Sequence, residues 1–395
     1  QAAKGFFFGD AGIRHPFNEH GQIHSVFHMI LCCSPQWLFT IGACLSSLRI
    51  ADASLVGAAL SPHGGAFLMP SKVSLENDGY CTSNGCGEQA QTDCKACASS
   101  LHSAAAGAIK DFASLDPNLV VLTTPHSEAA ALDAHVVYAG GRTLTGDSER
   151  GRVSARTSLE SASLLKELKA AKVPVRSAEV HELRWAELIP LWFLPKALRE
   201  NVIIIAVQGG SAKPCAFGLH LTTWLSSRAD IRALWIVSGD LSHYHGDLKG
   251  CKNAPYAKST DAATFEDKIQ CWASSLNHDI LEEASQLDAG SCAQDGLVAL
   301  NCGLQATGSA WNPCVRAHDV CTYFGMMVAS FTPLGAANSS AACLPCGKKV
   351  AGLVGSAKRK HLGKSSSFLS KPSTYADGHA FLQCLVSRQK TQDDL

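Results

Sequence analysis

Three histidines of this 395-residue chain each lie a few residues beyond an apolar run that has the composition of a buried strand. They are His63 in "AALSPHGG", His126 in "VVLTTPHS" and His243 in "VSGDLSHYH". A proline directly precedes the first two; because proline fixes its own φ and restricts its neighbour, the next side chain projects at a defined angle. In open α/β sheets, ligands bind just beyond the carboxyl ends of the strands. We therefore expect the three imidazoles to converge on one rim of a sheet.

Converging histidines indicate a metal centre, because imidazole is a ligand that suits iron, zinc, copper and nickel. Two histidines and one carboxylate on one face are typical of non-heme Fe(II) oxygenases, which keep open positions for substrate and O₂. Two histidines with a third ligand also hold hydrolytic zinc. A lone histidine after a strand is more often a structural hydrogen-bonding residue, but three in equivalent positions disfavour that interpretation. The spacing alone does not decide between the metals.

The segments that must position these histidines alternate in character along the chain. Short apolar runs, typical of strands buried on both faces by helices, occupy residues 54–60, 118–124, 134–140, 201–207, 233–239 and 324–331. Alanine-, leucine- and charge-rich stretches of helical character lie between several of them, at residues 100–115, 156–172 and 264–285. This alternation predicts an α/β fold of three layers, in which helices flank a central mixed, largely parallel sheet.

Seven short motifs occur in an order that matches one enzyme family: "SPHGG", "VVLTTPHS", "ELIPLWFLP", "VSGDLSHYH", "APYA…TFEDKI", "CGLQA" and "YFGMMVASF". Together they resemble the subunit-B (LigB) type of class III extradiol ring-cleavage dioxygenases. The similarity is greater to the AMMECR1-associated branch, and the Memo proteins resemble the chain more distantly. The resemblance extends from Ser54 to Pro333 and so covers nearly the whole α/β region.

The resemblance implies a mixed-sheet α/β fold, an Fe(II) site and cleavage of an ortho-dihydroxy aromatic ring by O₂. His63 and His126 match the two iron-binding histidines of the family. His243 matches the histidine that acts as acid and base in catalysis. Asp240 and Ser242 would shape the turn before His243 and orient its ring. Iron is the metal that the resemblance implies, and the residue types leave zinc or copper open.

The chain departs from the family at two places. Relatives usually carry a glutamate before "CGL", where this chain has Asn301, and an amide oxygen binds iron more weakly than a carboxylate and brings no charge. Cys302 is adjacent and could supply a thiolate as the third ligand instead, as Memo-type proteins carry a cysteine at the matching place. Relatives typically have Asp-His-Gly before "LIPLWFL", where this chain has Arg184, Trp185 and Ala186.

These departures leave two functions open. In the first, the chain is a working extradiol dioxygenase in which Arg184 or Trp185 reshapes the choice of substrate; the planar fork of Arg184 could pair with a substrate carboxylate. In the second, activity is altered or lost and the chain is a LigB- or Memo-like metal-binding or interaction protein, in which Cys302 helps to capture a thiophilic ion such as Cu(I). A zinc hydrolase is a weaker third option, because no motif of that kind accompanies the histidines.

Composition divides the chain into three parts. Residues 1–50 form an N-terminal extension with no assigned role, and residues 51–334 form the dioxygenase-like domain. Residues 335–395 form a basic tail rich in serine and glycine, a composition typical of flexible segments. An insertion at residues 80–97, rich in turn-forming residues, holds Cys81, Cys86, Cys94 and Cys97. These four thiolates could enclose a structural zinc, although unpaired thiols fit the irregular spacing better.

The net charge and the cysteine content limit the classes of binding partner and the cellular compartment that we expect. Lys+Arg and Asp+Glu both number 34, so the zero net charge gives no general attraction to nucleic acid. The 17 cysteines follow no regular framework, so we expect mostly reduced thiols and a cytoplasmic location. The apolar stretch at residues 25–48 is interrupted by Pro35 and Gln36 and barely reaches the length of a membrane helix, so no membrane association is expected. The expected partners are a small aromatic diol and O₂, and a homodimer is compatible with the sequence.

Overall fold

The computed structural model describes eight segments of the chain, residues 54–64, 88–127, 133–148, 151–208, 212–243, 260–320, 325–336 and 342–347. Every described residue belongs to one compact unit within residues 52–395. The predicted extension, most of the predicted tail, Cys81, Cys86 and the side chain of Cys94 therefore lie outside the described residues.

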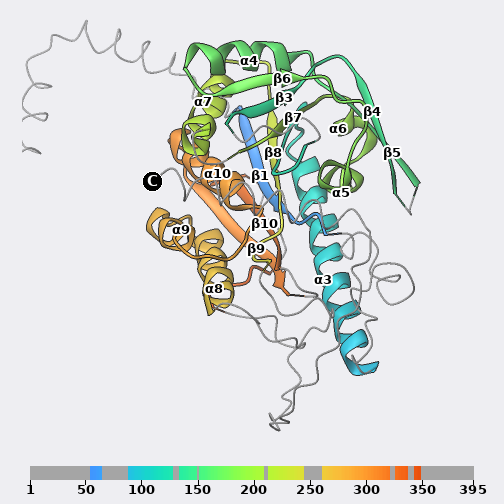
Figure 1. The fold of residues 1–395 in the computed structure, drawn as a ribbon, viewed down its shortest axis with the longest axis vertical. Coiled ribbons are helices and arrows are strands. Elements are labelled where there is room, and N and C mark those ends of the chain that lie inside the picture. Colours follow the sequence, from blue (N-terminus) through green and yellow to red (C-terminus); the bar gives the residue numbers. More distant parts are fainter. Residues whose placement is uncertain are drawn as a thin grey trace, which may run out of the picture. The chain divides into compact units, whose positions relative to one another are not determined.

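An eight-stranded sheet with the strand order β6-β3-β7-β2-β8-β1-β10-β9 forms the centre of this unit (Figure 1). Its strands are β1 (Leu55–Ser61), β2 (Leu119–Thr124), β3 (His135–Tyr138), β6 (Val175–Ala178), β7 (Val202–Ala206), β8 (Ala233–Ser238), β9 (Trp311–Asp319) and β10 (Met326–Pro333). The pairs β1–β8, β2–β8, β2–β7 and β3–β6 are parallel, whereas β1–β10, β9–β10 and β3–β7 are antiparallel. The prediction of a mixed, largely parallel central sheet flanked by helices is confirmed.

Helices cover both faces of the sheet, and the alternation of side chains along β2 shows the division. Leu119 and Val121 belong to one core cluster with residues of α4 (Glu160–Ala170), α7 (Pro214–Ser226), α8 (Thr260–Ser275), α9 (His278–Ser285) and α10 (Gln294–Ala306). Val120 and Leu122 belong to a second cluster with α3 (Glu88–Ala113), α5 (Trp185–Phe193), α6 (Lys196–Arg199) and the hairpin β4 (Thr143–Ser148) and β5 (Gly151–Arg156). Strands packed on both faces need apolar residues at every position, which explains their continuous apolar runs. None of the helices within the described ranges is both long and apolar enough to span a bilayer.

The cysteine-rich insertion differs from its prediction after residue 87. Helix α3 begins at Glu88, so Cys94 and Cys97 belong to a helix and not to a loop of turn-forming residues. The run from Glu88 to Cys97 contains Glu, Gln, Ala and Lys, which favour the helix and offset the single Thr and Asp. Cys97 is fully buried and packs in the second core cluster.

Part of the predicted flexible tail is fixed to the sheet. The N–H of Leu344 donates to the carbonyl of Val315 on β9 over 2.7 Å, which adds a short bridge to that edge strand. Two of the disulfides found among the described residues tie this segment to β9 and α8, and a third joins α7 to α10: Cys314–Cys343, Cys271–Cys346 and Cys215–Cys302. The expectation of reduced thiols is therefore wrong for these six cysteines.

Candidate metal centre

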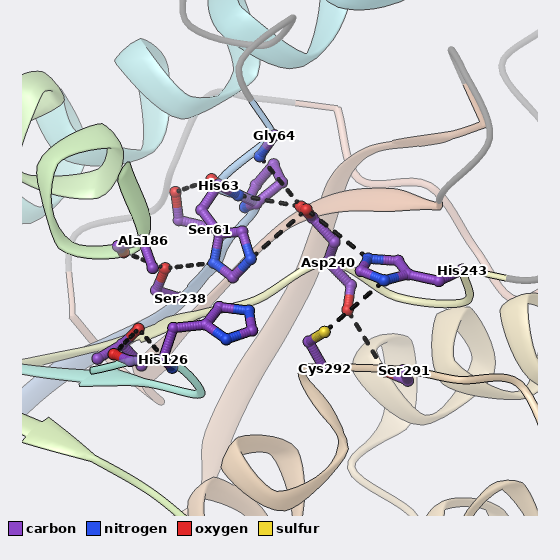
Figure 2. A network of polar contacts seen from close by, with 12 residues as sticks. Ser61, His63, Gly64, His126, Ala186, Ser238, Asp240, His243, Ser291 and Cys292 are labelled. Carbon is purple, nitrogen blue, oxygen red and sulfur yellow. Dashed lines mark hydrogen bonds and ion pairs between the residues drawn. The ribbon is translucent and has the colours of Figure 1, made fainter. Parts of the chain in front are cut away.

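The three predicted histidines lie at the carboxyl ends of three neighbouring strands. β1, β8 and β2 are adjacent and parallel, so their carboxyl ends meet at one edge of the sheet. His63 and His126 each lie two residues beyond the end of β1 and β2, and Asp240 and His243 follow the end of β8 by two and five residues. Figure 2 shows these four side chains gathered at this edge. The structure thus brings the histidines together as the strand pattern predicts.

The distances within this group are short. The ring centroids of His63 and His126 are 5.3 Å apart. Asp240 Oδ2 lies 3.5 Å from His63 Nε2 and 3.9 Å from His243 Nε2. His63, His126 and Asp240 are buried, and the His243 side chain is 12% exposed. The group therefore combines three imidazoles and one carboxylate in a place largely shielded from water.

Ser238 sets the tautomer of His63. The Ser238 hydroxyl donates to the backbone carbonyl of Ala186 over 2.6 Å, and its oxygen lies 2.9 Å from His63 Nδ1. A hydroxyl has a single proton, so Ser238 can only accept from His63, and Nδ1 must carry the hydrogen. The lone pair of His63 is then on Nε2, a buried atom that has no hydrogen-bond partner among the described residues. Metal-ligating histidines are typically neutral, with one ring nitrogen hydrogen-bonded to the protein and the lone pair of the other available to the ion.

Neither ring nitrogen of His126 has a hydrogen-bond partner among the described residues, and both nitrogens are buried. Burial, followed by repulsion from His243, lowers the pKa of His126 to about 3. Burial also holds the pKa of His63 well below its ordinary value, with repulsion from His126 and His243 as lesser causes. Both rings are therefore neutral at pH 7. A buried polar group left without a partner costs about 1–3 kcal/mol, so these nitrogens favour a bound ligand.

Asp240 ties the turn after β1 to the turn after β8. Its Oδ1 accepts hydrogen bonds from the backbone N–H groups of His63 and Gly64, over 3.0 and 3.3 Å. Its backbone carbonyl accepts from the N–H of Ala293, the residue before α10, over 3.1 Å. The carboxylate is therefore fixed through Oδ1, and its Oδ2 is turned towards the histidines (Figure 2).

A second buried polar group, which we call the Glu266 cluster, supports the same turn from α8 and β9. Ser242 donates to Glu266 Oε1 from its backbone N–H, over 2.8 Å, and from its hydroxyl. Glu266 Oε2 lies 2.7 Å from His318 Nε2, and His318 Nδ1 lies 3.1 Å from Gln270 Oε1. The sequence pointed to Ser242 alone of these four residues. The available signal was a glutamate and a glutamine four residues apart, hence on one face of a predicted helix.

Helix α5 places its first residue over the two buried histidines. The Trp185 ring centroid lies 4.6 Å from the centroid of each of these two rings. Arg184 lies just before the helix, where its backbone N–H donates to Glu187 over 2.9 Å and its half-exposed guanidinium pairs with Glu182 over 3.1 Å. The structure therefore brings Trp185 to the site, whereas Arg184 is engaged at the start of the helix.

A buried tyrosine–glutamate pair behind α5 was not predicted. Tyr138 on β3 donates to Glu187 Oε1 over 2.6 Å. Burial raises the pKa of Glu187 to about 7, although the hydrogen bonds it accepts oppose this shift. Tyr138 also shares a hydrogen bond with Ser127, the residue after His126. The pair therefore connects the turn that carries His126 to the helix that carries Trp185.

The two predicted third ligands lie within α10 and have other partners. Asn301 accepts a hydrogen bond from Trp272 Nε1 over 3.0 Å, and its amide nitrogen lies 2.8 Å from His278 Nδ1. Cys302 is bonded to Cys215 on α7. Helix α10 begins beside the turn after β8, and a residue seven positions from its start is about 10 Å further along the helix. The structure does not bring either residue to the histidines.

The fit of this group to a metal ion can be judged from its donors. Within the described ranges, no three His, Cys, Asp or Glu side chains are already arranged as the ligands of one ion. The donor types nevertheless suit a divalent ion: two neutral imidazoles whose buried nitrogens lack partners among the described residues, and one carboxylate oxygen 3.5 Å from the Nε2 of His63. These donor types are ones that iron, zinc and copper take, and neither Asn301 nor Cys302 lies among them.

Comparisons with known proteins give a structural likeness and nothing closer. No family model matches the chain, and no curated protein matches it. Among solved structures, an uncharacterized protein from Escherichia coli K12 aligns with 70% of this chain and 99% of its own, at 14% sequence identity and a TM-score of 0.38. At that level the alignment carries no argument, so a functional assignment depends on the site itself.

Proposed function

We propose that this chain is a non-heme Fe(II)-dependent extradiol dioxygenase, which opens an ortho-dihydroxy aromatic ring with O₂ next to its two hydroxyl groups. The observation that carries the proposal is the pair of buried, neutral imidazoles with ring centroids 5.3 Å apart, which have ring nitrogens without partners among the described residues. Such nitrogens favour a metal, and imidazole suits iron. The order of the seven sequence motifs supports ring cleavage over other chemistry at a metal of this type.

His63 and His126 would hold the iron, His63 through the Nε2 that its bond to Ser238 leaves bare. When bound, Fe(II) supplies a point of attachment for both the diol and O₂ and a route for electron density from ring to oxygen. The chain keeps both rings neutral by burying them and keeps His63 aimed through Ser238 and the carbonyl of Ala186. Zinc and copper take the same ligands, so metal analysis has to accompany any assay of activity.

His243 would carry the proton chemistry. Its side chain is more exposed than His63 and His126, and its backbone N–H donates to the carbonyl of Ala289 over 2.9 Å, which holds the residue in place. Histidine suits a base that takes a phenolic proton near neutral pH and later returns it. The carboxylate of Asp240, 3.9 Å away, would stabilise the imidazolium in the interval.

Trp185 would form an aromatic wall of the site. Its ring contacts both buried histidines, so a planar substrate bound at the metal meets it. Aromatic rings gain about 0.5–1.5 kcal/mol from offset or edge contacts beyond the area they bury. The indole would therefore orient the substrate ring and exclude water from it.

A second candidate is a metal-binding protein without ring-cleaving activity on the same scaffold. Trp185 favours this candidate as well, because its ring already packs on both histidines. The version of this candidate that relied on a Cys302 thiolate and Cu(I) requires the Cys215–Cys302 disulfide to be reduced first. The two candidates therefore share the site formed by His63 and His126 and differ in whether it turns over a substrate.

Anaerobic reconstitution with Fe(II), followed by O₂ and a panel of catechols, tests the first candidate. We expect bound iron and a yellow ring-opened product. His126→Ala should lose both, whereas Arg184→Ala, which removes a half-exposed ion pair, should lose neither. Iron binding without product from any catechol would support the second candidate, and absence of any bound iron, zinc or copper would overturn both.

We propose a cytoplasmic location because the spacing of the cysteines is irregular. The three disulfides instead favour an oxidising compartment. Thiol titration of the unfolded chain distinguishes the two. All 17 cysteines should react if the chain is reduced. At most 11 should react if the three disulfides are formed, because they remove 2 × 3 = 6 of the 17 thiols.

A further inference from the structure

We propose that Asp240 supplies the third, anionic ligand of the metal centre through its Oδ2, in the place for which the sequence suggested Asn301 or Cys302. The inference rests on the proposed metal site and names the ligand that completes it. It gives the chain a centre of two histidines and one carboxylate, in which the carboxylate precedes the catalytic base by three residues on the same turn.

Two separations, from His63 to Asp240 and from His63 to His126, are those expected of pairs that share one ion. Two donor atoms that each lie about 2 Å from the same ion are about 3–3.5 Å apart. His63 Nε2 and Asp240 Oδ2 are 3.5 Å apart. Two imidazoles that share an ion through ring nitrogens have centroids about 5 Å apart by the same construction. The His63 and His126 centroids are 5.3 Å apart.

The two oxygens of Asp240 have separate surroundings. Oδ1 accepts from two backbone N–H groups, those of His63 and Gly64. These bonds fix the plane of the carboxylate, so that Oδ2 is directed at the ring that carries a bare nitrogen (Figure 2). A ligating carboxylate is commonly hydrogen-bonded in this way by the protein around it. The backbone of one ligand, His63, thus positions the other.

Charge favours the same assignment. A divalent ion held in a buried site by neutral imidazoles alone would keep its whole charge uncompensated, which is costly in a low-dielectric surrounding. Asp240 is 4% exposed and brings a carboxylate within reach of His63 and His243. The amide of Asn301 brings no charge and bonds to Trp272 and His278.

Asp240→Asn tests the assignment, because asparagine keeps an oxygen that can accept from the two backbone N–H groups while replacing Oδ2 with an amide group that brings no charge. The probe is Co(II) alone, titrated into metal-free full-length protein and followed by its visible absorption and by competition with a chelator. We expect the affinity to fall by at least about 100-fold, since changes next to ligands already cost 10–100-fold. Asp279→Asn is the matched control, the same substitution at an exposed position on α9.

The rival ligand is tested in parallel with Asn301→Ala, which should leave the Co(II) affinity and spectrum unchanged. The assignment is overturned if Asp240→Asn binds Co(II) as the wild type does, if Asn301→Ala empties the site, or if the wild type binds no Co(II). Should Asp240→Asn fail to fold by circular dichroism, X-ray absorption of the cobalt-loaded wild type decides. A shell of nitrogen and oxygen only, with unchanged affinity in Asn301→Ala, supports Asp240, and a sulfur neighbour overturns it.

None of these readouts requires ring cleavage. If Asp240 controls Co(II) affinity but no catechol is turned over by the iron form, the proposed activity fails and the ligand assignment stands. If catechols are cleaved and Asp240→Asn keeps full metal affinity, the activity stands and the assignment fails.

Discussion

Two buried histidine groups lie on either side of one turn, and they differ in how many of their ring nitrogens are hydrogen-bonded. In the Glu266 cluster, both ring nitrogens of His318 have partners, Glu266 at 2.7 Å and Gln270 at 3.1 Å. At the candidate metal centre, neither ring nitrogen of His126 has a partner among the described residues. Burial makes an unbonded polar group costly, so a fold that tolerates one in this position favours a ligand there. His318, which has hydrogen-bond partners at both ring nitrogens, therefore stabilises the fold. His126, which has none among the described residues, is available to bind a ligand.

The two groups are connected through the turn after β8. Ser242 is hydrogen-bonded to Glu266, while Asp240 and His243, two residues before and one after it, belong to the candidate metal centre. The carbonyl of Ser242 also accepts from the N–H of Gly325 over 2.9 Å, and a Cβ at that glycine would clash with the Glu266 carboxylate. A rigid, fully bonded group therefore holds the turn that presents the reactive one.

The largest expected effect is the loss of turnover when His243, the proposed base at the candidate metal centre, is removed. His243→Ala should lower kcat by about 10²–10⁴-fold, the usual contribution of general acid–base catalysis, while bound iron stays at the wild-type level. Single-turnover kinetics of the iron form, together with metal analysis, measure both quantities. Loss of the metal in His243→Ala would make His243 a ligand and contradict its assignment as the base.

The next effect contrasts the two groups directly in the metal-free protein. His318→Leu leaves Oε2 of the buried Glu266 carboxylate without its histidine partner and should lower the free energy of unfolding by about 3 kcal/mol. His126→Leu removes two nitrogens that have no partner among the described residues, so it should change that free energy by less than about 1 kcal/mol or raise it. Urea denaturation of both variants measures the difference. Equal losses in the two variants would show that His126 has a structural partner.

The three strands that end at the candidate metal centre, β1, β8 and β2, were predictable because each is marked by a continuous run of apolar residues in the sequence. The run "VVLTTPH" is a buried strand followed by a proline and a histidine, and the parallel pairing of β1, β8 and β2 brings such ends to one edge. The four-residue strand β6, the nine-residue strand β9 and the hairpin β4–β5 were missed. β6 and the hairpin carry exposed and polar residues at many positions, so their sequences lack the continuous apolar run.

The contacts that join distant segments were not predictable. Glu266 and His318 are 52 residues apart, and only the pairing of β9 beside β10 brings His318 under the turn after β8. The partners of Asn301, the predicted third ligand, were not predictable for a similar reason. Asn301 was chosen by its place in a motif, whereas its partners, Trp272 and His278, become visible only when α8, α9 and α10 pack together.

The third expected effect is a pH dependence of the free energy of unfolding, caused by His126 at the candidate metal centre. In the metal-free protein the folded-state pKa of His126 is about 3, against the ordinary value of 6.5. Between these values the unfolded chain binds the proton and the folded chain does not, so stability falls as the pH falls, by at most about 1.4 kcal/mol per pH unit. Above pH 6.5 both states are neutral and this contribution is constant. His126→Leu should flatten the slope in urea denaturation between about pH 6.5 and 5, and an unchanged slope would contradict the burial of a neutral imidazole.

The smallest expected effect concerns the aromatic wall, and it separates the two candidate functions. In a dioxygenase, Trp185→Ala should raise KM for a catechol by roughly 2–10-fold, the value of about 0.5–1.5 kcal/mol for an aromatic contact, with little change in kcat or in Co(II) affinity. Trp192→Ala, which removes an indole from the same helix that packs on Phe193 and His102, is the matched control. If Trp185 instead closes the site of a metal-binding protein, its removal should expose the metal and speed Co(II) exchange without creating turnover. A variant with unchanged KM and unchanged Co(II) exchange would mean that the indole only fills space over His63 and His126.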